Sequence, residues 1–381
     1  MDLSLTHEQN SLYDEVLEFA QSNLNANIDG RDRAGAFSNE LWAQCGKQGL
    51  PGLPVPITNG GRDLDALSCA LAYEALGYGC RDNGLTFSLG AHLSTVVVPL
   101  WKYGTDQQKE RFLTTLSDGS VIASAAATEL ETGSDTFAMR TSARREGSHF
   151  ILNGKKHYVT NIPEASLAIV YAYTDRERRF LGGLTAFLVS LNSPGVNVSG
   201  PVAKLGLRTS PLGMIELFDV VVPEDAVVGG VGGGARVFQT AMNWERALLM
   251  ASHVGTMRRT LEEAIEYART RSQSGRPIGK FQAVSHRLVD SKVSLEAARL
   301  LVFRAASNLD SPDAMLTSAI AKLFVSEAYV EATMTAIRTR GAAGYVESNE
   351  TERFVRDSIG ATIYSGTSDI QRNIISSWLG M

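Results

Sequence analysis

Cysteine is scarce in this sequence, and the few cysteines present are not spaced for a disulfide framework or a zinc site. The 381 residues include three, Cys45, Cys69 and Cys80, an odd number without a CxxC pair or a Cys/His spacing. Small disulfide-rich domains and zinc sites depend on such patterns. We therefore expect no metal centre, and three reduced thiols that pack as small apolar side chains.

An excess of positive charge is also missing. The chain has 36 Lys and Arg against 41 Asp and Glu, which gives a formal net charge of −5. The basic residues are dispersed along the sequence, so they do not form the stripe or patch that binds nucleic acid. Nucleic acid is therefore excluded as an expected partner.

A secretory leader and a membrane span are not evident either. The amino terminus MDLSLTHEQ has neither a basic start nor an apolar stretch. No later window approaches the roughly 20 apolar residues of a membrane span. With 44% hydrophobic and 20% charged residues the composition is that of a folded globular protein. We expect a cytoplasmic protein without a membrane partner.

Helical periodicity dominates the first part of the chain. Thr6 followed by Gln9 forms a capping box, and Leu12, Val16 and Phe19 then recur at helical spacing. Apolar residues keep a spacing of three and four up to about residue 120, with Pro and Gly breaks in LPGLPVPITNGGRD. The pattern predicts a helical amino-terminal domain over residues 1–120.

The pattern changes to short β-prone runs over residues 121–228. In HFILNGKKHYVTN two such runs flank Asn153-Gly154, a dipeptide that favours a type I′ hairpin turn. The runs LAIVYAY, LTAFLVSL and MIELFDVVVP are rich in Val, Ile, Phe and Tyr, and Gly, Pro and Asp separate them. We predict a small central β domain here.

Long helical patterns return over residues 229–381. The stretch GGVGGGAR at 229–236 resembles a phosphate loop, but it lacks the GK[ST] ending and is better explained as a link into the next helix. The three long patterns that follow predict a helical bundle. Helices, β domain and bundle in this order predict a segregated α+β fold rather than an alternating parallel sheet.

The polar motifs, taken singly, admit two interpretations each. Thr128 with Gly133 and Ser134 offers a hydroxyl and turn N–H groups that could cradle a phosphate or a flavin edge, or could form a plain capped turn. Tyr158 and Thr160 lie on one face of a strand, where they could meet a flat ligand or pack on the helices.

Together and in order, the motifs resemble the acyl-CoA dehydrogenase family across essentially the whole chain. ATELETGSD and KKHYVTN are similar to its flavin-binding segments, and RTRSQSGRPIGKFQ to the stretch that reaches the FAD of a neighbouring subunit. GAAGYV, VRD and YSGTSDIQR complete the resemblance. It implies a helical amino-terminal domain, a central β-barrel-like domain and a carboxy-terminal four-helix bundle, with FAD bound between domains and between subunits.

The resemblance also implies which residues bind FAD. Thr128 and Thr160 would hydrogen-bond the flavin ring, Tyr158 would lie against it, and Gly133 and Ser134 would meet the pyrophosphate. A partner subunit of a homodimer or homotetramer would complete the site, and its residues would be Arg271, Gln282, Arg338, Ala342, Thr367 and Asp369. The sequence departs from the family where many members have glutamine, phenylalanine and glycine, at Arg338, Ser274 and Ala342.

The largest departure concerns the catalytic base. Many members carry it as the glutamate of a terminal YEGTS, whereas this chain has Ser365, and a hydroxyl needs an activator to act as a base. The isovaleryl type instead holds a glutamate on the first bundle helix, the place of Glu245 in NWERALL. A glutamate beside Arg246 is usually a solvated charge, but Trp244 and Leu248 provide an apolar setting that raises a carboxyl pKa.

We therefore identify Glu245 as the candidate base that removes the Cα proton of an acyl thioester. The resemblance implies that the backbone N–H of Ser365 donates to the enolate oxygen. The segments NGLTFSLGAHLSTVVVPL, NWERALL and YSGTSDIQRNII resemble prolyl-carrier-protein dehydrogenases. This implies that a prolyl group on a peptidyl carrier protein is oxidised towards pyrrolyl thioester in natural-product biosynthesis.

Four questions stay open at this level: the substrate, whether the fold is catalytic, the flavin reoxidant and the role of His92. The substrate could be a short or branched acyl-CoA or another small carrier-bound acyl group, and the fold could be a noncatalytic flavin-binding scaffold. Flavin reoxidation could use an electron-transfer flavoprotein or oxygen. His92, in GAHLS, could approach the substrate entrance or pack in the core.

Overall fold

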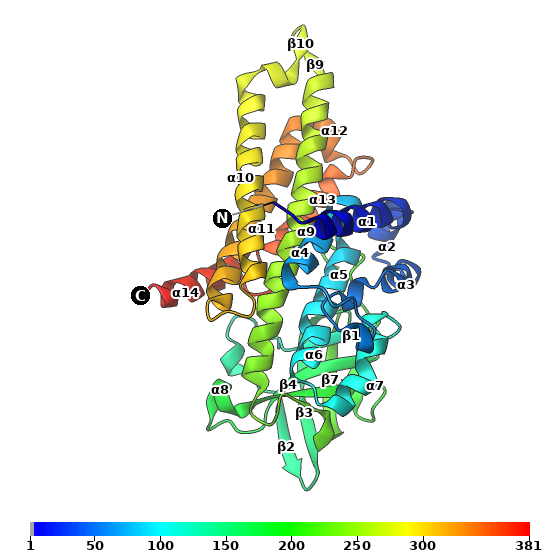
Figure 1. Ribbon diagram of the computed structural model, residues 1–381, viewed down its shortest axis with the longest axis vertical. Helices are drawn as coiled ribbons and strands as arrows, with labels where there is room; N and C mark the ends of the chain where they lie inside the picture. The colour runs from blue at the N-terminus through cyan, green and yellow to red at the C-terminus, as the bar shows by residue number, and fades with distance from the viewer. Residues whose placement is uncertain (1–3) are drawn as a thin grey trace.

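Helices form the first and last parts of the chain and strands the middle, as Figure 1 shows. The computed structural model describes residues 4–381. The prediction that the amino terminus is not a leader falls partly on residues 1–3, which lie outside the described residues. The first part consists of α1 (His7–Asn23), α2 (Ile28–Ala34), α3 (Asn39–Lys47), η1 (Leu50–Gly52), η2 (Ile57–Asn59), α4 (Ala66–Gly79), α5 (Asn83–His92), η3 (Leu93–Val97), α6 (Val98–Tyr103) and α7 (Asp106–Ser117).

The predicted capping box begins α1. The Thr6 hydroxyl accepts the Gln9 N–H at 3.2 Å, and the Gln9 side chain accepts the Thr6 N–H at 3.1 Å. Leu12 and Val16 are buried on the face towards α4. The three cysteines are also buried, and none forms a disulfide within residues 4–381.

A continuous helical run from α5 through the π-helical η3 to α6 forms the centre of the first part. This run, Asn83–Tyr103, is long and apolar enough to cross a membrane by length and composition, so our statement that no window approaches a membrane span was wrong. However, 94% of its apolar window is buried inside the protein. Its hydrophobicity is that of a core helix covered on all sides.

The middle of the chain forms one eight-stranded sheet with short helical insertions. Its spatial order is β6-β7-β3-β2-β4-β5-β8, with β1 pairing in parallel with β4. Residues of β4 alternate between the helices (Ile169, Tyr171) and a second apolar core (Ala168, Val170). The elements are β1 (Ala123–Ala126), η4 (Thr136–Ala138), β2 (Ser142–Glu146), β3 (His149–Thr160), β4 (Leu167–Tyr173), α8 (Arg179–Gly183), β5 (Leu184–Ser190), β6 (Val196–Val198), β7 (Leu212–Pro223), η5 (Glu224–Ala226) and β8 (Val227–Val228).

The hairpin predicted at Asn153-Gly154 was wrong. These residues lie inside β3, a strand of 12 residues, and the turn into this strand is made at Gly147, whose φ is +60°. Gly154 occupies an irregularity in the pairing of β3 with β7. A Cβ there would lie 2.4 Å from the Thr141 Oγ1, so the glycine permits a close approach rather than a turn.

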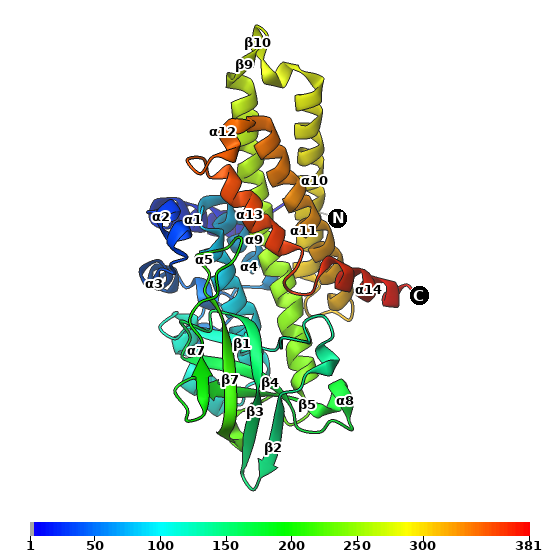
Figure 2. The ribbon, with the colours of Figure 1, turned by 180° about the vertical axis from the view of Figure 1, so that it is seen from behind.

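The last part is a bundle of long helices, which rises above the sheet in Figures 1 and 2. The glycine-rich stretch links β8 to the first of them, as expected. A short hairpin crosses the far end of the bundle. The elements are α9 (Gly234–Thr270), β9 (Ser272–Gln273), β10 (Arg276–Pro277), η6 (Ile278–Lys280), α10 (Gln282–Ser307), α11 (Ala314–Arg340), α12 (Ala342–Tyr345), α13 (Thr351–Ala361) and α14 (Ser368–Trp378).

Helix α9 connects the bundle to the rest of the molecule. It packs on α4, α10 and α11, and its lower end reaches the sheet. The α4 and α9 backbones approach closely, because a Cβ on Gly77 would lie 1.9 Å from the Ser252 carbonyl oxygen and one on Gly255 2.0 Å from that of Glu74. Two glycines thus fix the position of the helix that carries Glu245.

Candidate active site

Glu245 is a buried carboxyl on α9, only 7% exposed. Trp244 and Leu248, its neighbours in the sequence, are buried as well. Burial raises the pKa of Glu245 to about 7, against the opposing effects of a hydrogen bond from Ser365 and the charges of Arg246 and Lys322. The interpretation of Glu245 as a solvated surface charge does not fit this position. Near neutral pH the group can both take and release a proton.

The loop between α13 and α14 lies against Glu245. The Ser365 Oγ donates to the Glu245 Oε2 at 2.9 Å. The Ser365 carbonyl in turn accepts from the Arg246 Nε and the Gln371 Nε2, both at 3.1 Å. Gln371 also donates to the Gly366 carbonyl at 2.8 Å. The Glu245 and Arg246 contacts therefore hold the YSGTS turn against α9, and Gln371 holds it against α14.

The threonine of the first flavin-like motif lies near this helix. Ala126 of β1 pairs with Val170 of β4, the residue before Tyr171, and Thr128 follows two residues beyond the end of that pairing. Tyr171 lies edge-on to Phe238 of α9, with 5.4 Å between ring centroids. Burial and then the negative charge of Glu245 raise the pKa of Tyr171. The end of β1 and the base thus share one neighbourhood.

The second flavin-like motif joins the first. The His157 N–H donates to the Thr128 carbonyl at 2.9 Å, which brings Thr128, Tyr158 and Thr160 together. The Tyr158 ring is 57% exposed on a backbone with φ of +55°, so its interpretation as a packed strand face was wrong. Neither the Thr128 nor the Thr160 hydroxyl makes a hydrogen bond within residues 4–381. An aromatic face and two free hydroxyls are available to a flat ligand.

A buried ion pair between Glu129 and Lys156 supports the turn that follows Thr128, and the sequence analysis missed it. The Lys156 Nζ lies 2.9 Å from the Glu129 Oε1, and Glu129 also accepts the N–H groups of Arg140 (2.6 Å) and Thr141 (2.9 Å). Burial alone would raise the pKa of Glu129, but Lys156 and these donors lower it to about 2. Both residues stand inside the quoted motifs, yet 27 positions separate them, and spacing alone does not reveal such a contact.

The tip of the turn is open. Gly133 and Ser134 are exposed, and a Cβ added to Gly133 would have no atom within 4 Å. The structure therefore presents this turn at the surface.

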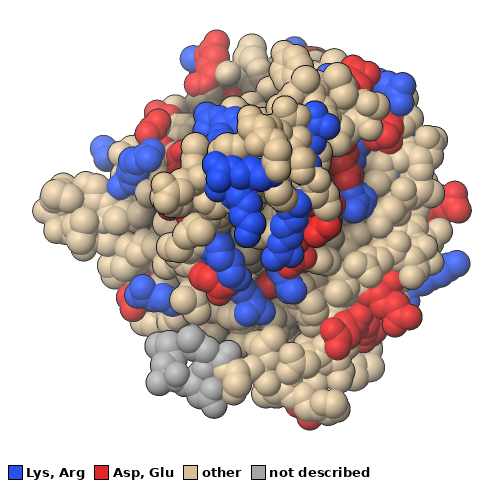
Figure 3. Space-filling view, turned by 90° about the horizontal axis from the view of Figure 1, so that it is seen from above, with Lys and Arg blue, Asp and Glu red and all other residues tan. Residues whose placement is uncertain are grey.

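The residues assigned to a partner subunit lie elsewhere on this chain. Arg271 and Gln282 are at the β9/β10 end of the bundle, with Arg338 and Ala342 where α11 meets α12. In Figure 3, which shows the molecule from above, several Lys and Arg side chains gather on this end. Thr367 caps α14 by accepting the Ile370 N–H at 3.2 Å, and Asp369 is exposed beside it. Arg271, Gln282, Arg338 and Ala342 thus lie at the far end of the bundle, whereas Thr367 lies two residues after Ser365, which bonds to Glu245.

His92 is a core residue and not part of an entrance. Its Nδ1 accepts the Ala123 N–H at 3.1 Å, so the proton is on Nε2, which donates to the Leu116 carbonyl at 2.9 Å. Burial lowers the pKa of His92 to about 4. Of the two interpretations of GAHLS, packing is the one that the structure supports.

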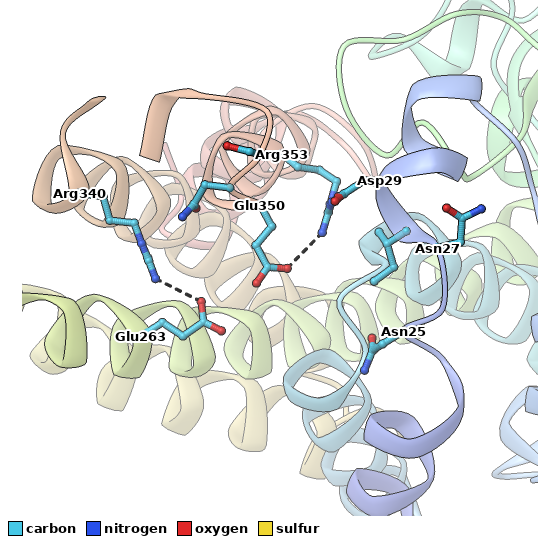
Figure 4. Close-up of a pocket in the computed structure, with 10 residues that line it drawn as sticks. Asn25, Asn27, Asp29, Glu263, Arg340, Glu350 and Arg353 are labelled. Carbon is cyan, nitrogen blue, oxygen red and sulfur yellow. Dashed lines mark hydrogen bonds and ion pairs between the residues drawn. The ribbon is translucent and has the colours of Figure 1, made fainter. Parts of the chain in front are cut away.

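A polar cavity of about 440 Å³, drawn in Figure 4, lies apart from Glu245. Its walls are ion pairs: Arg340 with Glu263 at 3.6 Å, and Arg353 with Glu350 at 3.2 Å. Arg353 also contacts Asp29 on α2. Because the charged side chains of the cavity wall are paired with one another, we interpret the cavity as a structural junction between the amino-terminal helices and the bundle.

Comparison with known proteins identifies the class. Models of the amino-terminal, middle and carboxy-terminal domains of acyl-CoA dehydrogenase match residues 6–120, 124–220 and 232–380. The chain belongs to the acyl-CoA dehydrogenase family, and the predicted order of helical, β and helical parts is confirmed.

Its similar relatives narrow the class. An L-prolyl-[peptidyl-carrier protein] dehydrogenase of Pseudomonas fluorescens is 43% identical over 91% of this chain and 92% of its own. The crystal structure of the prolyl acyl carrier protein oxidase AnaB has a TM-score of 0.97 and 40% identity, covering 99% of this chain and 100% of that one. The structure of PigA with FAD and proline has a TM-score of 0.97 and 39% identity, covering 100% and 99%.

Proposed function

We propose that this chain is an FAD-dependent dehydrogenase that oxidises the Cα–Cβ bond of a prolyl thioester held by a peptidyl carrier protein. The observation that carries the proposal is the buried Glu245 carboxyl, which has a pKa of about 7 and is held by the Ser365 hydroxyl. The prolyl-carrier-protein dehydrogenases similar to this chain support the substrate.

FAD fits the residues present. The exposed Tyr158 ring and the free hydroxyls of Thr128 and Thr160 suit the flavin ring, and the open turn at Gly133 and Ser134 suits the pyrophosphate. When bound, FAD accepts the hydride that leaves Cβ. We assign the far end of the cofactor to a partner subunit, through Arg271, Gln282, Arg338, Ala342, Thr367 and Asp369.

Residues of this chain would carry out the other two tasks, which are removal of the Cα proton and stabilisation of the enolate. Ionised Glu245 takes the Cα proton; its Oε2 is held by Ser365, while Oε1 makes no hydrogen bond within residues 4–381. The Ser365 N–H makes none either in this described part of the chain, so it can donate to the developing thioester enolate. Because Ser365 both bonds to the base on α9 and provides the donor, the two groups are held relative to each other, which reduces the reorganisation needed at the transition state.

A homodimer or homotetramer follows from the divided FAD site. Exposed apolar side chains on the outer surface of α10 (Val289, Val293) and at the end of α14 (Trp378, Leu379) suit contacts between subunits. We also propose domain boundaries at 1–120, 121–228 and 229–381, supported by the change from helix to strand at Ala123 and back at Gly234. Either an electron-transfer flavoprotein or oxygen is the reoxidant.

A substrate panel tests the proposal. FAD-loaded protein is mixed without oxygen with prolyl-carrier protein and, separately, with isovaleryl-CoA, and flavin bleaching and intact product mass are followed. The proposal expects bleaching by prolyl-carrier protein, and loss of four hydrogens from the prolyl group after repeated turnover with an acceptor. Bleaching by isovaleryl-CoA alone would establish the branched acyl-CoA alternative, and no bleaching by either would favour the noncatalytic scaffold.

A further inference from the structure

We propose that the side chain of Ser365 is a positioning residue for Glu245: its hydroxyl holds one carboxylate oxygen so that the other faces the substrate. The inference rests on the proposed function and deepens it, since the backbone and the side chain of one residue then act on two different atoms of the reaction. The position that holds a base in YEGTS would here hold the base's orienting group.

The hydroxyl makes a direct contact that other groups around Glu245 do not. Within residues 4–381 the Ser365 Oγ is the only hydrogen-bond donor to the Glu245 carboxyl, at 2.9 Å from Oε2. The Lys322 Nζ of α11 and the Tyr171 hydroxyl of β4 are buried near it without hydrogen-bond partners in the described chain. Lys322 and Tyr171 therefore interact with the Glu245 carboxyl electrostatically and not through a hydrogen bond.

The charged and titratable groups that face Glu245 come from every packed element. Arg246 lies next to it on α9, Lys322 on α11, Tyr171 on β4, and Tyr364 precedes Ser365 in the turn. Arg246 is committed to the Ser365 carbonyl through its Nε. Within residues 4–381 none of these groups donates a hydrogen bond to the carboxyl, whereas the directional bond from Ser365 favours one rotation of it.

The Ser365 hydroxyl is itself held in place. Its backbone has a φ of +56°, which an L side chain adopts only when the surroundings impose it. Arg246 and Gln371 impose it through the Ser365 carbonyl. A side chain on such a fixed backbone loses little entropy when it bonds to Glu245, which suits a positioning role.

The test uses two variants that both lack the hydroxyl but differ in backbone strain, Ser365→Ala and Ser365→Gly. In FAD-loaded protein without substrate, the Glu245 carboxyl is titrated by infrared difference spectroscopy, and Glu245→Gln assigns its band. Because a hydrogen bond to a charged group is lost, we expect the midpoint to rise by about one pKa unit in both variants. Ser365→Cys keeps a weak donor and should restore part of the shift. Ser377→Ala is the control, because the hydroxyl of this α14 serine donates to the Asn373 carbonyl and not to Glu245.

The rate of flavin bleaching by an accepted thioester adds a second readout. The acid limb of its pH profile should move with the infrared midpoint, with a lower maximal rate and little change in substrate affinity. Unchanged Glu245 midpoints in both variants would overturn the positioning role. A midpoint that shifts in Ser365→Ala but not in Ser365→Gly would also overturn it, because backbone strain would then be the cause. If the Glu245 midpoint shifts but prolyl-carrier protein does not bleach the flavin, the positioning role of Ser365 is upheld and the proposed substrate is rejected.

Discussion

At the scale of single residues, burial controls the chemistry of the molecule. Glu245 is identified from its place in the sequence once the family resemblance is seen, and its apolar flanks correctly predict desolvation. Its hydrogen bond from Ser365 is not predictable, because 120 residues separate the two. His92 shows the converse, since a lone histidine in a conspicuous motif is explained by two core hydrogen bonds.

The pH dependence of turnover follows from Glu245. The base is active only when ionised and its pKa is about 7, so kcat/KM should fall about tenfold for each pH unit below 7. Single-turnover bleaching measured from pH 5 to 9 checks this. An acid limb near the ordinary glutamate value of about 4.3 would mean that the base is solvated.

Stability against acid should depend on His92. Its pKa is about 4 in the fold and about 6.5 in the unfolded chain, so between these values the unfolded chain binds more protons and stability falls as pH falls. The loss approaches about 3 kcal/mol at pH 4. Urea unfolding of wild type and His92→Asn from pH 4 to 8 measures it, and the difference between the two should shrink as pH falls. A difference independent of pH would show that His92 is not buried as the neutral form.

At the scale of elements, local sequence signals predict the ends of helices and strands correctly only where long-range contacts favour the same ends. The capping box of Thr6 begins α1 as predicted. Asn153-Gly154 has an equally good local signal for a turn, yet its strand continues because β7 pairs with β3 on both sides of an irregularity at this dipeptide. The strand content of the region was predictable, but the position of its turn depended on contacts with residues about 60 positions away.

The buried ion pair of the flavin-facing turn should be essential to that element. Lys156→Met leaves the Glu129 carboxylate buried without its counter-charge, which costs about 3 kcal/mol of unfolding free energy and weakens FAD binding. Lys155→Met is the matched control, since Lys155 pairs with Glu216 at the surface and should contribute under about 1 kcal/mol. Denaturant unfolding and FAD titration of both variants distinguish them, and equal losses would contradict the structural role of the pair.

At the scale of the whole molecule, the sequence order of helices, strands and helices predicts the architecture, because each part keeps one periodicity over a long span. The packing of α4 on α9 was not predictable, because two glycines far apart in sequence meet there. The residues that we propose for the two ends of FAD lie in different parts of the chain, so we propose that an oligomer completes the site.

Complementation between subunits tests this division. A Thr160→Val/Tyr158→Ala double variant damages the near half of the site, and Arg271→Glu/Gln282→Ala the far half, so each alone should lose FAD. When the two are refolded together, mixed dimers contain one intact site, and roughly a quarter of the wild-type FAD content should return. Recovery of none would mean that a single chain supplies both halves.

The anaerobic rate of flavin bleaching in Glu245→Gln tests the central claim most directly, with Glu266→Gln, an exposed glutamate of the same helix, as control. Both variants should bind FAD and keep the oligomeric state of the wild type. Loss of a positioned general base predicts a rate about 10³-fold lower for Glu245→Gln and an unchanged rate for the control. A rate for Glu245→Gln within tenfold of wild type would contradict the assignment of Glu245 as the base.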